Sequence, residues 1–72
     1  MEIEKEYVIS SNVEAVGYSE DYQVLRVWFI NGSVYDYSGV NKMEYEALRD
    51  APSVGSYLYQ NIRGQYPYEK VG

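Results

Sequence analysis

The sequence QVLRVWFINGSVYDY, residues 23–37, decides the fold of this chain. Gln23 to Ile30 and Val34 to Tyr37 are rich in β-branched and aromatic residues, which favour strands. Between them, Asn31-Gly32-Ser33 has the residue types of a tight turn. The stretch therefore predicts a β-hairpin, and the rest of the chain is interpreted around it.

The hairpin has two candidate registers, and a shift by one residue exchanges the two faces of a strand. A two-residue Asn-Gly turn pairs Trp28 with Tyr35 and places Asp36 among apolar neighbours. A three-residue loop over residues 30–32, with Gly32 in the left-handed conformation, aligns an apolar set from both strands instead. That set is Leu25, Val27, Phe29, Tyr35 and Tyr37. We favour the second register because it keeps a carboxylate out of the core.

The favoured register leaves a second apolar face on the hairpin, which is too apolar to be left fully wet. Its candidate interface residues are Val24, Arg26, Trp28, Ile30 and Val34. A tryptophan flanked by Arg26 and Asp36 is typical of the centre of a protein interface. Two alternatives remain open: the helices pack on this face, or residues 7–9 fold over it.

Two further strands are predicted before the hairpin, around residues 7–10 and 13–18. After the hairpin, the apolar spacing becomes helical. Asn41, with Glu44 three residues on, predicts a helix over residues 42–50 that Pro52 ends.

A second helix is expected from a Ser53 cap to Gly64, which fits the left-handed position that often ends a helix. Residues 66–68 are expected to be extended. The predicted fold class is α+β, a small antiparallel sheet of three to four strands followed by two short helices packed on one face. Residues 1–72 form one domain.

The chain of 72 residues has ten tyrosines, no cysteine and no histidine. The missing residue types remove thiol and histidine nucleophiles, His/Cys metal sites and the commonest general base. Carboxylates alone, in so small a domain, do not indicate catalysis, so we expect a non-catalytic protein with no metal and no cofactor. Self-association is the remaining way to reinforce such a small core.

The formal charge of −5 is unevenly distributed along the chain. Residues 1–36 hold seven acids and two bases, whereas residues 37–72 hold four of each. Only the C-terminal third is therefore suited to an anion. No secretion signal or membrane-spanning stretch is evident in the sequence, so we expect a cytoplasmic protein.

The periodicity assigns Tyr18, Tyr35, Tyr37 and Tyr45 to core packing, but the tyrosines near the C-terminus fall in the segment that is not acidic. The candidate ligand-binding residues there are Tyr57, Tyr59, Asn61, Arg63, Tyr66 and Tyr68. Aromatic faces beside an arginine are typical of sites that stack nucleic-acid bases.

Several motifs occur in an order that resembles the KTSC domain family. They include Ser10-Ser11-Asn12-Val13, Val16-Gly17-Tyr18, Asn31-Gly32 followed by Tyr35-x-Tyr37, Ser53-x-Gly55-x-Tyr57, Asn61-Ile62-Arg63 and Tyr66-Pro67-Tyr68. The resemblance covers about residues 8–71 and implies a short stand-alone bacterial or phage protein, or the C-terminal appendage of some lysyl-tRNA synthetases. It also implies RNA as a candidate partner.

The sequence predicts two candidate functions. The first is a self-associating interaction module that contacts a protein partner through the hairpin face around Trp28. The second is binding of RNA or a small nucleotide-like ligand by the C-terminal tyrosines and Arg63.

Overall fold

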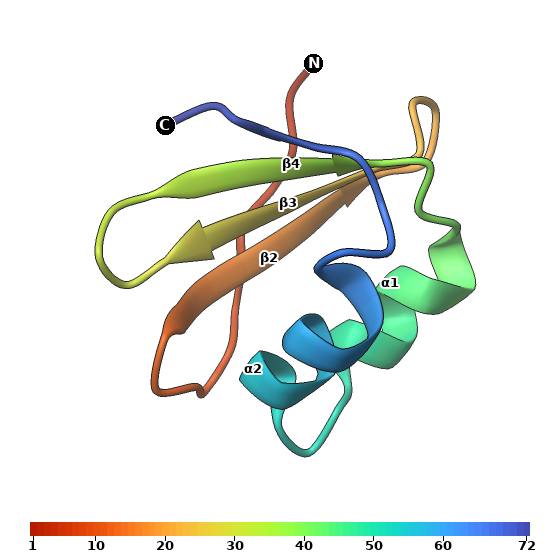
Figure 1. Cartoon of the computed structure of the whole chain (residues 1–72). Helices are drawn as coiled ribbons and strands as arrows, with labels where there is room; N and C mark the ends of the chain where they lie inside the picture. Colours follow the sequence, from red (N-terminus) through yellow and green to blue (C-terminus); the bar gives the residue numbers. More distant parts are fainter.

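The computed structural model describes residues 1–72 as a five-stranded antiparallel sheet with helices on one face (Figure 1). Its elements are β1 (Glu6–Tyr7), β2 (Val13–Ser19), β3 (Val24–Phe29), β4 (Val34–Ser38), α1 (Lys42–Arg49), α2 (Val54–Tyr57), the π-helical turn η1 (Leu58–Ile62) and β5 (Tyr68–Lys70). The strands lie side by side in the order β1-β2-β3-β4-β5. The predicted α+β class is confirmed. No helix is long and apolar enough to span a bilayer.

The hairpin adopts the three-residue loop. Val27 lies opposite Tyr35 and Leu25 opposite Tyr37. The Phe29 N–H donates to the Ser33 carbonyl at 2.8 Å, which leaves residues 30–32 as the loop. Gly32 has a φ of +96°, a conformation that side-chain-bearing residues rarely adopt. The favoured register is therefore confirmed.

Each helix begins at the capping residue predicted from the sequence. Asn41 accepts a hydrogen bond from the Glu44 N–H at 2.8 Å and starts α1. Ser53 accepts one from the Ser56 N–H and starts α2. The helix then widens into η1, whose last bond runs from the Arg63 N–H to the Leu58 carbonyl.

One hydrophobic core lies between the helices and the face of the sheet that carries Leu25 and Val27. The helices contribute Tyr45, Leu48, Val54, Leu58 and Ile62, all buried. Helix packing on this face confirms the layer arrangement and leaves the Trp28 side as the outer face of the sheet.

β1 forms close to the first strand predicted from the sequence, and β5 adds a strand beyond the three to four expected. β5 has only three residues, too few for a side-chain pattern to mark it as a strand. β1 and β5 are strands because their backbones pair with β2 and β4. β1 consists of Glu6 and Tyr7 alone, so residues 8–10 of the predicted first strand lie outside it.

The N-terminal segment lies over the outer face of the sheet, behind it in the view of Figure 1. A Cβ atom placed on Gly17 would come within 2.4 Å of the Glu4 carbonyl oxygen and 2.5 Å of Ile3. Only glycine permits so close an approach of another backbone. The same added atom would meet the Trp28 ring at 3.2 Å, so the segment packs beside the tryptophan.

Candidate functional site

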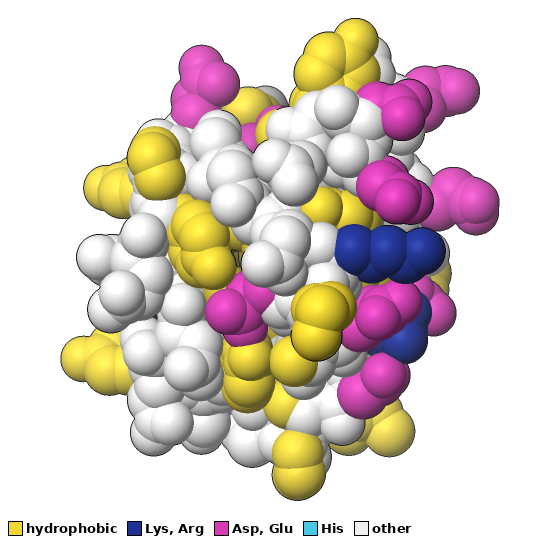
Figure 2. Space-filling view, turned by 90° about the vertical axis from the view of Figure 1, so that its right-hand side faces the viewer, with side chains coloured by type: hydrophobic (Ala, Val, Ile, Leu, Met, Phe, Trp, Pro, Cys, Tyr) yellow, Lys and Arg dark blue, Asp and Glu magenta, His cyan; other side chains and the backbone are white.

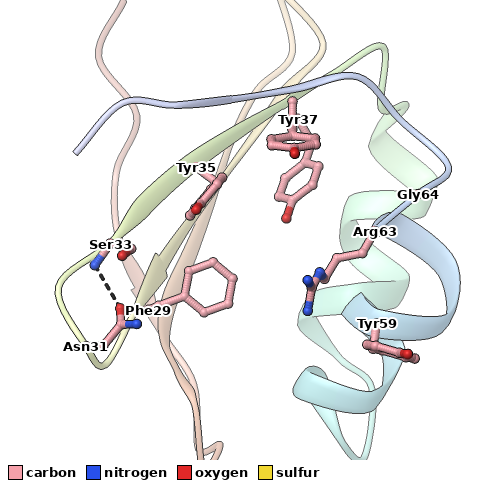
Figure 3. Close-up of a pocket in the computed structure, with 9 residues that line it drawn as sticks. Phe29, Asn31, Ser33, Tyr35, Tyr37, Tyr59, Arg63 and Gly64 are labelled. Atoms are coloured by element: carbon pink, nitrogen blue, oxygen red, sulfur yellow. Dashed lines mark hydrogen bonds between the residues drawn. The ribbon is translucent and has the colours of Figure 1, made fainter.

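A cleft of about 640 Å³ opens between the hairpin end, β5 and the C-terminal end of η1 (Figure 3). It lies on the helix-bearing side of the sheet, beyond the packed core. Its lining residues are Phe29, Asn31, Ser33, Tyr35, Tyr37, Tyr59, Arg63, Gly64 and Tyr68. The volume falls in the range of small-molecule sites.

Strand register places most of the cleft's aromatic rings on one face. Tyr68 lies opposite Tyr37, and cross-strand partners project from the same side of a sheet. The Tyr68 ring centre is 5.9 Å from that of Tyr35 and 6.1 Å from that of Tyr37. Phe29 meets Tyr35 edge-on at 5.7 Å. The rings form a continuous aromatic wall.

Arg63 extends from the end of η1 toward this wall (Figure 3). Its guanidinium lies 5.6 Å from the centre of the Tyr59 ring, within cation–π range. Burial raises the pKa of the Tyr37 hydroxyl, and the positive charge of Arg63 partly offsets that rise. Arg63 therefore acts electrostatically on the cleft.

Arg63 and Lys70 are the two basic side chains that have no acidic partner. The other four form ion pairs: Lys5 with Glu14, Arg26 with Asp36, Lys42 with Glu20, and Arg49 with Asp50. Lys70 lies opposite Tyr35 and projects from the cleft side of β5. No carboxylate lines the cleft. In the view of Figure 2, the basic side chains and most of the acidic ones lie toward the right-hand margin, and other acidic side chains lie at the upper left and near the centre.

Hydrogen bonding separates the tyrosines into two groups. The hydroxyls of four of them have partners within the protein: Tyr18, Tyr45, Tyr57 and Tyr66. None of the cleft tyrosines is hydrogen-bonded in this way. Tyr37 is only 4% exposed, yet no buried side-chain polar atom in the protein lacks a partner, so its hydroxyl reaches the cleft surface. The cleft thus presents free hydroxyls.

The predicted ligand-binding residues are only partly brought together. Tyr59, Arg63 and Tyr68 line the cleft. Tyr57 and Tyr66 point elsewhere and donate to the Glu44 carboxylate, which ties α1 to the C-terminal segment.

Asn61 also lies outside the cleft lining and donates to the Tyr57 carbonyl at 3.3 Å. Phe29, Tyr35 and Tyr37 were assigned to the core, and Asn31 and Ser33 to the turn. The hairpin register could have indicated the strand residues of the cleft, because it aligns them at one end of the sheet.

The tyrosines that are hydrogen-bonded to carboxylates make the stability of the fold depend on pH in the alkaline range. Burial and then the hydrogen bond to Glu6 raise the pKa of Tyr45 to about 12, and the bond to Glu44 and then burial raise the pKa of Tyr57 to about 12. In the unfolded chain a tyrosine has a pKa of about 10. Between these values the unfolded state binds fewer protons, so the free energy of unfolding falls as pH rises, by on the order of 2 kcal/mol for buried Tyr45.

Urea unfolding at about pH 8 and about pH 11 measures this loss. Tyr45→Phe should flatten the dependence, whereas Tyr22→Phe, at a side chain that is 68% exposed, should leave it unchanged. Equal stability of the unmodified protein at the two pH values would contradict the assignment.

The predicted interface residues of the strands lie on the outer face, where parts of the same chain cover them, whereas Ile30 lies in the hairpin loop. Arg26 makes a two-pronged ion pair with Asp36 across the strands, at 2.7 and 2.9 Å. The Lys5 ammonium lies 5.4 Å from the Trp28 ring centre. Val24 and Val34 are half-buried, and Ile30 is 59% exposed. Residues 3–5, rather than 7–9, supply the cover.

Comparisons with known proteins agree on one family. The KTSC domain profile matches residues 9–66. The crystal structure of a KTSC domain protein from Yersinia pestis superposes with a TM-score of 0.92 at 28% identity, covering 99% of this chain and 100% of that one. An uncharacterized protein from Stutzerimonas stutzeri is 33% identical over 63 residues, which are 86% of this chain and 89% of that protein.

A lysine–tRNA ligase from Nostoc is 38% identical over 61 residues, which are 85% of this chain but 11% of the ligase. The chain thus spans about a tenth of the length of this curated relative. The fold is that of a small α+β domain with helices on one face of an antiparallel sheet. The chain belongs to the KTSC domain family, as the resemblance predicted.

Proposed function

We propose that this chain is a non-catalytic binding domain whose cleft holds an aromatic, anionic ligand of the nucleotide type, RNA included. The observation that carries the proposal is the position of Arg63 and Lys70. They are the two basic groups without an acidic partner in a chain of net charge −5, and both lie on the cleft side of the sheet. An anion is favoured there over any other part of the surface.

The aromatic lining supports a flat ligand. Base–aromatic stacking contributes about 1–3 kcal/mol per base, and stacking faces beside an arginine are typical of nucleic-acid sites. The free hydroxyls of the cleft tyrosines add polar contacts that the protein itself does not use. A cationic ligand would suit an all-aromatic cage, but the guanidinium of Arg63 opposes it.

The relatives support the RNA form of this proposal. The lysine–tRNA ligases that contain a similar segment act, by their name, on tRNA. Isothermal titration of the full chain at low ionic strength, with a mononucleotide and with a single-stranded RNA, tests the proposal. We expect heat of binding and a raised melting temperature, because a ligand that binds only the native state stabilises it. Absence of both signals with every nucleotide and RNA would reject the proposal.

Self-association through the hairpin is a second candidate, favoured by the exposure of Ile30 in the hairpin loop. We expect native mass spectrometry to find assemblies heavier than the 8.4 kDa chain and Ile30→Asp to reduce them. Ile30 is the better position for this test because Trp28 already packs against residues of its own chain. Met43→Asp is a matched control at a 79% exposed site on α1. A single-chain mass at every concentration would contradict self-association.

A further inference from the structure

The number of free cations limits how many phosphates the cleft can hold. We propose, building on the proposed function, that its ligand is a short nucleotide with one or two phosphates and a base that presents carbonyl oxygens, rather than a long strand of RNA. Arg63 lines the cleft, and Lys70 projects from the same side of the sheet next to Tyr35. Together they suit one or two phosphate groups, because each basic group neutralises about one phosphate charge.

The surface beyond the cleft offers a strand nothing further. Every other basic side chain is already paired with a carboxylate. The chain as a whole carries eleven acids. A strand that continued out of the cleft would meet repulsion without compensating contacts. The charge distribution therefore favours a ligand that ends within the cleft.

The hairpin turn supplies the group that contacts the base. The Asn31 side-chain oxygen accepts a hydrogen bond from the Ser33 N–H at 2.9 Å. Since a backbone N–H requires an acceptor, this bond fixes the orientation of the amide. The Asn31 Nδ2 group has no partner in the protein and lies at the cleft, where it offers only N–H donors.

The two polar ends of the cleft are separated by an aromatic ring. In Figure 3 the Phe29 ring lies between Asn31 and the guanidinium of Arg63. A base stacked in this region would direct its polar edge toward the turn and its phosphate toward Arg63. Donors at the turn match guanine or uracil carbonyls, whereas adenine presents an amino group on the edge where guanine has O6.

Titration of the unmodified chain with GMP, UMP, AMP, uridine and a long oligouridylate tests this assignment. We expect GMP and UMP to bind about fivefold more tightly than AMP, the effect of about one hydrogen bond. Uridine, which lacks the phosphate, should bind at least about tenfold more weakly than UMP. For the oligouridylate, the slope of log affinity against log salt should be no steeper than about −1.4, corresponding to two phosphate contacts.

Asn31→Asp is the matched variant for the base contact. The aspartate retains the acceptor for the Ser33 N–H, so the turn is kept, but it has no donor for a carbonyl. Its added charge should weaken all three mononucleotides together, while the ratio of GMP to AMP affinity falls to about one. A circular dichroism spectrum matching that of the unmodified chain confirms that the variant is folded.

The outcomes distinguish failure of the short-nucleotide assignment from failure of the proposed function. Equal affinity for AMP and GMP, or an oligouridylate salt slope steeper than about −3, would overturn the short-nucleotide assignment and leave the proposed function standing. Absence of binding by every probe would overturn both.

Discussion

Arg63→Ala is expected to lower the affinity of the cleft for a nucleotide by about ten- to one-hundred-fold. Hydrogen bonds to a charged group contribute about 1.5–3 kcal/mol, and about 1.4 kcal/mol corresponds to a tenfold change in affinity. Arg63 is exposed and its backbone bond to Leu58 does not involve the side chain, so the fold should be unaffected. Isothermal titration with GMP at low ionic strength measures the loss.

Lys42→Ala is the matched control for charge. It removes one positive charge from an exposed position on α1, outside the cleft lining. Its effect on nucleotide affinity should be small. Arg63→Lys should recover part of the affinity, because it restores the charge without the planar group that stacks and binds phosphate in two places. Equal losses in the Arg63→Ala and Lys42→Ala variants would show that Arg63 makes no direct contact.

Arg26→Ala is expected to destabilise the domain strongly. Asp36 is 9% exposed and lies on the outer face, and its ion pair with Arg26 is the side-chain contact that compensates its charge. Removing one partner of a fully buried pair costs about 3–5 kcal/mol, and this pair, with side chains 22% and 12% exposed, should approach the lower end. A core of this size supplies about the same amount. Urea unfolding followed by circular dichroism measures the change.

Two further variants separate the ion pair from simple loss of packing. Arg26→Met together with Asp36→Leu should recover most of the stability, because apolar residues of similar volume replace the pair without leaving a lone charge. Lys42→Ala, which breaks an exposed pair with Glu20, should cost less than about 1 kcal/mol. If Arg26→Ala costs no more than Lys42→Ala, the pair does not stabilise the sheet.

The register of the hairpin was predictable because, of the two candidate loops, only the three-residue loop aligns the apolar residues of both strands on one face. The argument that kept Asp36 out of the core selected the correct loop, although Asp36 is buried all the same. Its burial is tolerated because the register places Arg26 directly opposite. The helix starts at Asn41 and Ser53 were equally predictable, since a cap is a contact between residues three apart in sequence.

The composition of the cleft was only partly predictable. Arg63 stood out because it lies in the segment without excess acid. Tyr35 and Tyr37 have the periodicity of core residues, and one face of a strand can both support a core and line a cleft where the helices stop covering it. Tyr57 and Tyr66 have the same sequence character as Tyr59 and Tyr68, yet they bind Glu44 instead.

The sequence by itself determined the α+β order of elements, the hairpin register and the helix caps, because these depend on near neighbours and on alternation along a strand. Only the tertiary structure decided which tyrosines have free hydroxyls, which two cations lack partners and what covers Trp28. Each of these depends on contacts between residues far apart in the chain, such as Lys5 with Trp28. Side-chain type and spacing do not specify such contacts before the sheet and helices are packed.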